Sequence, residues 1–170
     1  MRAFCVAGVL AGALCWAPIP SQATTLKAFS LEQLAARSDA VVRGRVGPSQ
    51  GVWKDRVIHT MTEVAVSQVL RGNAPATVVV AQLGGRVGND WMPVAGVAPL
   101  EPGEDVVLFL RAQPDGTWVL CGMSQGKLAV ETPGTLRWSP TAPLWTGSTL
   151  VEPSSRAVTM DALRRALEAP

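Results

Sequence analysis

The side chains best suited to chemistry are few in this sequence of 170 residues. His59 is the single histidine, and Cys121 is one of three cysteines. Zinc sites in proteins combine several histidine, cysteine or carboxylate ligands at short, regular spacings. Neither His59 nor Cys121 has a second histidine or cysteine at such a spacing. We therefore expect no metal site and no other cofactor.

A hydrolytic triad would need His59 beside a serine and an acid. The candidate partners are Ser38 and Ser67 for the nucleophile, and Asp39 and Glu63 for the acid. No serine has the flanking glycines of a nucleophile elbow. We expect no catalytic residue and predict a protein that is not an enzyme. A hydrolase that depends on His59 is the catalytic alternative.

A glycine-rich segment, Gly84–Gly88, has the glycine content of a phosphate-binding loop. It lacks the Gly-Lys-Ser/Thr ending of such loops and no helix is expected after it, so a flexible turn is predicted. Acidic residues surround the same region without the spacing of an EF-hand calcium loop. These residues are Asp90, Glu101, Glu104 and Asp105.

The tryptophans are the most informative of the remaining side chains. Trp53 and Trp91 fall in segments expected to be loops, where an exposed indole is a common anchor of protein contacts. Together with Arg86, from the same long loop as Trp91, they are the candidate binding residues. The alternative is that these indoles only cover the ends of the fold. Trp118 alternates with Leu120 and is expected in the core.

The first 23 residues have the pattern of a secretory signal peptide. Arg2 precedes the apolar stretch Ala3–Ala17, and the small residues Ser21–Ala23 follow. A positive start, an apolar stretch of about 15 residues and a small-residue site are typical of a cleaved signal. An uncleaved anchor would need roughly 20 apolar residues and a charged flank. We expect cleavage after Ala23, no membrane span in the mature chain, and a secreted or periplasmic protein.

Cleavage would also remove two cysteines, Cys5 and Cys15, and leave Cys121 without an intramolecular disulfide partner. A lipid anchor on Cys15 would need a small residue before it, where the chain has Leu14. Cys121 is expected to be a small buried side chain, with a reactive thiol or an intermolecular bridge as the alternatives. The chain has 15 Lys+Arg against 13 Asp+Glu. Such a near-neutral balance gives no electrostatic footprint for nucleic acid.

The elements that position these residues are mostly strands. Val57–Leu70 alternates between two faces over ten residues and is the clearest strand, with His59 on its polar face. Ala40–Val46 precedes it, and Gly44 inside that strand indicates a bulge or a close backbone approach. Further strands are predicted over Thr77–Leu83, where both faces are expected to be buried, and over Asp105–Arg111, Thr117–Cys121 and Lys127–Glu131.

Helices are predicted only near the two ends. Ser30 and Gln33 have the spacing of a capping box, which predicts a helix over Leu31–Arg37. Thr159 is expected to cap a second helix over 160–169. Five or six short strands, with a short N-terminal helix and a C-terminal helix, predict an all-β fold, a small closed β structure.

The expected organisation has four parts. A signal peptide covers 1–23, and the closed β domain with its N-terminal helix covers 24–131. An extended Pro-rich arm covers 132–158, and the C-terminal helix covers 159–170. The sequence indicates no oligomeric state.

Three short segments carry a resemblance to a known family. They are Ser38–Val46, Val69–Gly72 and Gly103–Leu110. Across roughly Ser38 to Val130 the chain resembles the netrin-like modules of tissue inhibitors of metalloproteinases. It is also similar to secreted bacterial proteins that have no assigned function. The resemblance implies that the predicted five- to six-stranded β structure, with its short N-terminal helix and C-terminal helix, is a secreted OB-fold-like closed barrel that serves as a binding surface.

The chain departs from those inhibitors at its expected N-terminus. They bind the protease zinc through an N-terminal cysteine clamped by disulfides, whereas Thr24 is the expected first residue here. No inhibitory residue is therefore carried over from the family to this chain.

The leading functional hypothesis is a secreted, non-catalytic module that binds another secreted protein, with a protease as one candidate. Its contacts would come from the loops Gly84–Leu100 and Gly51–Arg56. The alternative is a carbohydrate-associated or envelope-associated structural protein, in which Trp138 and Trp145 on the Pro-rich arm make the contacts.

Overall fold

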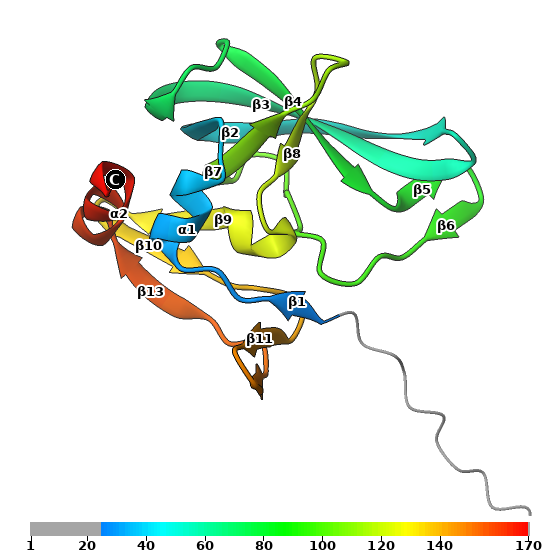
Figure 1. Cartoon of the computed structure of the whole chain (residues 1–170). Coiled ribbons are helices and arrows are strands. Elements are labelled where there is room, and N and C mark those ends of the chain that lie inside the picture. The colour runs from blue at the N-terminus through cyan, green and yellow to red at the C-terminus, as the bar shows by residue number, and fades with distance from the viewer. Residues whose placement is uncertain (1–24, 170) are drawn as a thin grey trace, which may run out of the picture.

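The computed structural model describes residues 25–169, so the expected signal peptide lies outside the described residues. The described chain is mainly β, with helices α1 (Leu31–Ala36) and α2 (Met160–Glu168) near its two ends (Figure 1). This confirms the predicted β-rich class and both helices. The Ser30 hydroxyl accepts from the Gln33 amide, and the Gln33 side chain accepts from the Ser30 amide, as the capping box predicted.

The main sheet has eight strands in the order β13-β10-β9-β7-β2-β3-β4-β8. Its strands are β2 (Ala40–Lys54), β3 (Val57–Gly72), β4 (Thr77–Leu83), β7 (Asp105–Ala112), β8 (Trp118–Leu120), β9 (Lys127–Thr132), β10 (Thr135–Trp138) and β13 (Arg156–Thr159). Strand β8 also pairs with β7. The strands β2, β3, β4, β8 and β7 therefore follow one another in a cycle of pairings. The pairing of β4 with β8 is parallel, and the other four are antiparallel.

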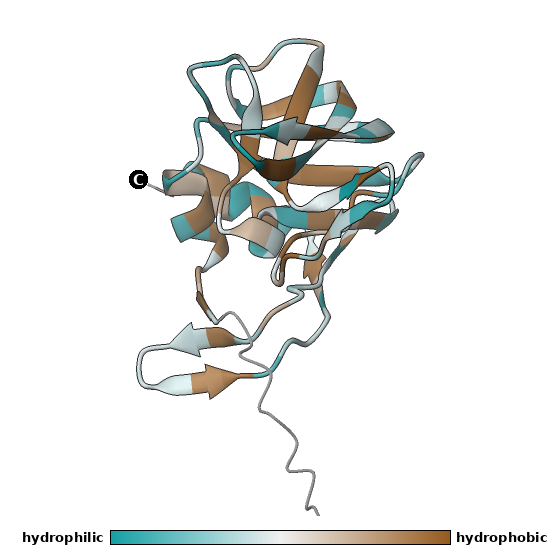
Figure 2. Cartoon of the chain, turned by 90° about the vertical axis from the view of Figure 1, so that its right-hand side faces the viewer, coloured by the Kyte–Doolittle hydropathy of each residue, from teal (hydrophilic) through white to brown (hydrophobic). Residues whose placement is uncertain are grey.

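Two smaller sheets complete the fold. Strand β11 (Leu144–Thr146) lies between β1 (Leu26–Lys27) and β12 (Thr149–Val151). The β11–β12 hairpin projects from the rest of the molecule (Figure 2). Strands β5 (Gly85–Val87) and β6 (Asp90–Met92) form a separate hairpin.

The segment expected to be an extended Pro-rich arm is therefore folded into paired strands. Strand β10 pairs with both β9 and β13, and β11 and β12 form the projecting hairpin. Four prolines are present between 132 and 155, and none of them lies inside one of these strands. The prolines lie between the short strands of this segment and do not prevent those strands from pairing.

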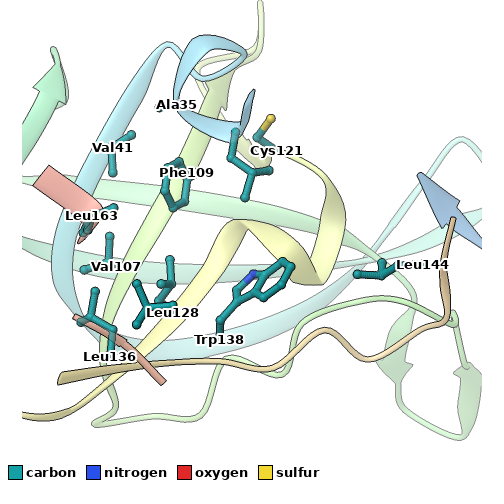
Figure 3. Close-up of a cluster of buried hydrophobic side chains, with 12 residues drawn as sticks. Ala35, Val41, Val107, Phe109, Cys121, Leu128, Leu136, Trp138, Leu144 and Leu163 are labelled. Atoms are coloured by element: carbon teal, nitrogen blue, oxygen red, sulfur yellow. The ribbon is translucent and has the colours of Figure 1, made fainter. Parts of the chain in front are cut away.

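Strand β7 is buried on both faces and separates two hydrophobic cores. Its residues alternate, so Leu108 and Leu110 face the core inside the cycle of strands, which we call the ring core. Val107 and Phe109 face the core beneath the helices, the helix-side core, where Leu163 of α2 also packs (Figure 3). Burial on both faces was expected for β4 instead. That expectation was wrong at the end of β4, where Leu83 is 50% exposed.

Strand β2 is much longer than expected, because the predicted loop 47–56 continues the strand to Lys54. The register of β2 against β3 shifts between Val46 and Ser49, which marks a bulge that accommodates Pro48. The hairpin turn consists of Asp55 and Arg56, both with positive φ (51° and 64°). Positive φ at both central residues is the geometry of a type I′ turn, which matches the twist of the two strands.

The close backbone approach predicted at Gly44 is present. A Cβ added at Gly44 would lie 2.5 Å from the Ala65 carbonyl oxygen of the neighbouring strand. The register between β2 and β3 also shifts at this point. Any side chain at position 44 would push the two strands apart.

Candidate functional site

The candidate site is built on two hairpins that touch each other. A Cβ added at Gly51 of β2 would lie 1.9 Å from the carbonyl oxygen of Arg86 in β5. The Gly84 amide donates to the Ile58 carbonyl at 2.7 Å, and the Thr60 hydroxyl donates to the Gly84 carbonyl at 2.8 Å. The β5–β6 hairpin is therefore held against the β2–β3 hairpin, as Figure 1 shows at the right of the molecule.

Arg86 and Trp91 share the outward face of the β5–β6 hairpin. They are register partners across the two strands, so their side chains lie on the same face. Their neighbours Gly85 and Val87 face the other way, toward β3 and β2. Trp91 is 66% exposed.

Trp53 lies on β2, two residues beyond Gly51 and on the same face of the strand. Its indole is 52% exposed, although its register partner Ile58 is buried. The expected positions in loops were wrong, since Trp53 is on β2 while Arg86 and Trp91 are on β5 and β6. The structure nevertheless brings the hairpins that carry the three candidate residues together.

A hollow of about 220 Å³ lies beside Trp91 and Leu83. Its polar side chains bind one another or the backbone: Ser49 and Thr62 share a hydrogen bond of 2.9 Å, and Gln82 donates to the Ala98 carbonyl at 3.0 Å. The walls therefore combine apolar side chains with polar groups that already have hydrogen-bond partners. We call Trp53, Leu83, Arg86 and Trp91, together with this hollow, the hairpin surface.

Sequence reasoning missed Leu83 and the hollow. Leu83 ended a strand that was expected to be buried on both faces. Its exposure depends on where β4 ends against β3, opposite His59. No local sequence signal indicated the hollow, because its walls come from segments far apart in the chain.

An ion pair joins the tip of the β2–β3 hairpin to the turn between β7 and β8. Lys54 Nζ lies 2.7 Å from Asp115 Oδ2. The same carboxylate accepts from the backbone amide and the hydroxyl of Thr117. The hydrogen bond with Lys54, followed by those with Thr117, holds the pKa of Asp115 well below its usual range. The same ion pair raises the pKa of Lys54.

The structure does not assemble the triad considered around His59. Ser67 is eight residues further along β3, a distance of about 26 Å along an extended strand. Ser38 lies near the same far end of β3, and its hydroxyl donates to the Leu34 carbonyl at 2.7 Å. The side-chain contact of His59 is a 3.3 Å approach of Nδ1 to the Val57 carbonyl.

Two of the four acidic residues near the long connection are bound to cations of the protein. Asp105 accepts two hydrogen bonds from Arg43, at 3.1 and 2.7 Å, and Glu104 pairs with Lys127 at 2.7 Å. Among residues 25–169, no three side chains of histidine, cysteine, aspartate or glutamate come together in a way that could hold a metal ion. The predicted flexible turn at Gly84–Gly88 is strand β5 over most of its length.

Cys121 is free and buried in the helix-side core. Burial raises the pKa of its thiol, although the Ser38 hydroxyl acts in the opposite direction. A buried, protonated thiol is a poor nucleophile, so this cysteine behaves as the small apolar side chain that was expected.

The other three tryptophans among residues 25–169 have different surroundings. Trp138 is 6% exposed, and its indole N–H donates to the Gln125 carbonyl at 2.8 Å. Trp145 on β11 is 43% exposed. Trp118 is half-buried against the ring core, close to its expected position. Of the two tryptophans proposed for carbohydrate contacts, Trp145 alone is therefore substantially accessible.

No protein-family model matches the chain, and no curated protein or solved structure is significantly similar to it. The resemblance to netrin-like modules therefore stays a prediction that rests on the three sequence segments. Neither helix formed by residues 25–169 has the length and apolar character needed to cross a membrane.

Proposed function

We propose that the protein is a secreted or periplasmic, non-catalytic binding module built on an OB-fold-like closed barrel. The cycle of pairings supports the barrel. If β2, β3, β4, β7 and β8 are numbered 1 to 5, their neighbours follow the order 1-2-3-5-4-1, with strands 3 and 5 parallel. This is the strand order of the OB fold, whose strands and loops commonly serve as binding surfaces. The netrin-like resemblance implies the same fold.

The observation that carries the binding function is the exposure of two indoles on hairpins that touch each other. Trp53 and Trp91 are both more than half exposed, on backbones held by strand pairing and by the contact between Gly51 and Arg86. Tryptophan and arginine dominate the residues that contribute most to protein interfaces. Because the hairpins are already fixed, little backbone entropy would be lost on binding.

The hollow indicates how a partner would dock. A cavity of about 220 Å³ accepts one apolar side chain, and its own polar groups already have hydrogen-bond partners. A partner that presents an apolar side chain between Trp91 and Leu83 would displace water without leaving a polar group unpaired. We therefore propose another secreted protein as the partner. The family resemblance makes a protease the first candidate.

The test compares what the wild-type protein and surface variants capture from the secreted fraction of the source organism. The double variant Trp53→Ala/Trp91→Ala should lose the partner that wild type retains. Trp145→Ala is the matched control, because it removes an exposed indole from another part of the molecule. Recovery of the same proteins, in the same amounts, on wild type and on the double variant would refute the proposal.

A carbohydrate-associated or envelope-associated role is the second candidate. It depended on Trp138 and Trp145 acting together on an arm, but Trp138 is buried. Deleting 133–153 would remove strands of the fold, so the role is tested by substituting Trp145 alone. One observation supports this role: Trp145 lines a groove that also contains charged side chains.

A further inference from the structure

A groove of about 970 Å³ lies between the segment that precedes α1, the β11–β12 hairpin and β13. None of its lining residues belongs to the hollow of the hairpin surface, so the two sites are distinct. Its walls combine aromatic side chains with polar and charged ones. The charged residues of the lining are Lys27, Glu152 and Arg156.

Arg156 is held in a fixed orientation. Its guanidinium carbon lies 4.1 Å from the centre of the Trp138 ring. Trp138 is fixed in turn, because its ring is buried and its N–H is bound to the Gln125 carbonyl. A guanidinium stacked on an aromatic face keeps its N–H groups available in its own plane. Arg156 is thus prepared to bind a planar anion at little cost in side-chain entropy.

Trp145 and Lys27 also line the groove. They are register partners on β11 and β1, so their side chains emerge on the same face of the small sheet. The lining therefore includes a half-exposed tryptophan and a lysine beside the stacked arginine.

The charge of the groove is positive. The lining contains two cationic side chains, Lys27 and Arg156, and one carboxylate, Glu152. None of the ion pairs formed within residues 25–169 involves any of the three. Outside the lining, the pKa of Glu32 is lowered mainly by its hydrogen bond with Ser30 and to a smaller extent by the charge of Arg156.

We infer that the groove binds an acidic saccharide, a sugar chain that carries carboxylate groups. The fork of Arg156 matches a carboxylate with two parallel hydrogen bonds, and Lys27 offers a second positive charge. The indole of Trp145 provides a flat apolar surface for the C–H face of a sugar ring. Covering the two cations with a neutral or purely apolar ligand would cost their hydration without replacing it.

An extended peptide is the competing kind of ligand. Peptides that bind along a sheet add to a strand edge with free backbone groups. Strand β11, which carries Trp145, is paired on both sides, whereas β12 and β13 are edge strands of their sheets. The uncharged polar side chains of the lining, such as Gln33 and Ser154, favour a sugar because they suit its hydroxyl groups.

The inference is tested by calorimetric titration of the mature protein with trigalacturonate, using maltotriose as the uncharged control. Trigalacturonate should bind at least tenfold more tightly than maltotriose. Arg156→Gln and Trp145→Ala should each weaken trigalacturonate binding at least tenfold. Arg165→Gln removes an exposed arginine of α2 outside the groove and should leave the affinity unchanged. The hairpin variant Trp91→Ala should also bind as wild type.

Folding is checked for every variant by its melting temperature. Arg156→Lys keeps the charge but loses the fork, so it should bind more weakly than wild type and more tightly than Arg156→Gln. If an Arg156 variant melts early, Trp145→Ala carries the test, because its ring is half exposed. Three results would each overturn the inference: equal binding of trigalacturonate and maltotriose, unchanged affinity in a folded groove variant, or tighter binding of tetraglutamate than of trigalacturonate.

Discussion

The hairpin surface and the groove both carry exposed tryptophan, but the groups beside the indoles differ. At the hairpin surface, Trp91 lies next to an uncharged hollow whose polar side chains already have hydrogen-bond partners. In the groove, Trp145 shares the lining with a stacked arginine, Arg156, and lies next to Lys27. Water leaves the first surface with little loss of hydration of polar groups, whereas the second needs a ligand that compensates its charges. The same residue type thus suits two kinds of recognition.

The buried tryptophan tests this contrast most strongly. Trp138→Ala should lower the free energy of unfolding by about 3–5 kcal/mol, the usual cost of truncating a large buried aromatic side chain. Trp53→Ala and Trp145→Ala should cost less than about 1 kcal/mol, because exposed substitutions are usually mild. Urea denaturation of the three variants measures the difference. Equal losses for Trp138 and Trp145 would contradict the assignment of Trp138 to the core.

Gln125 connects the groove to the core, and its substitution should have the next largest effect on stability. Its side-chain oxygen accepts from the Phe29 amide, and its NH₂ group donates to the Lys27 carbonyl. Gln125→Leu would leave these backbone groups without partners, at a cost of about 2–3 kcal/mol. Hydrogen exchange should accelerate at the Phe29 amide while the amides of β5 and β6 keep their protection. Faster exchange in both regions would show that the two surfaces are coupled.

Gly51 provides the reciprocal experiment at the hairpin surface. The Cβ of Gly51→Ala would meet the Arg86 carbonyl, a backbone group, so the β5–β6 hairpin must move. We expect a loss of about 1–2 kcal/mol, within the range for overpacked sites. Exchange should accelerate at the amides of β5 and β6 and stay unchanged in β1. Gly47→Ala, at another β2 glycine without positive φ, where an added Cβ comes no nearer than 3.2 Å to its neighbours, separates this clash from the general cost of replacing a strand glycine.

Short sequence patterns predicted the parts of the fold that depend on residues close together in the chain. The capping box of Ser30 and Gln33 predicted α1, and the long alternation predicted β3. The composition of 132–158 indicated an arm, but pairing with β9 and β13 decided its structure and buried Trp138. A hairpin turn made of Asp55 and Arg56 carries no glycine signal, which is why β2 was expected to end early.

The same limit applies to the candidate site. The sequence identified Trp53, Arg86 and Trp91 from residue type and loop position alone. It could not show that Gly51 brings their hairpins into contact, because that contact joins strands more than thirty residues apart in the chain. The stacking of Arg156 on Trp138 is likewise a product of the pairing between β10 and β13.

The ion pair between Lys54 and Asp115 gives the smallest expected effect and a characteristic pH dependence. The pKa of Asp115 is lowered in the folded state, so folding favours its ionised form. The resulting stabilisation is present above the unfolded pKa, about 3.9, and is lost as the pH falls through the lower folded value. Because both side chains are exposed, the gain is small and screened by salt.

The variant Asp115→Asn isolates this carboxylate from the others. Wild type should be slightly more stable than Asp115→Asn at pH 6, and the difference should shrink as the pH falls below 4. Thermal melts at pH 6 and at pH 2, each at low and high salt, measure the stability difference. The groove variant Trp145→Ala is the control, because its stability difference from wild type should not change over this range. A difference between wild type and Asp115→Asn that is as large at pH 2 as at pH 6 would mean that the charge of Asp115 does not hold the hairpin tip to the β7–β8 turn.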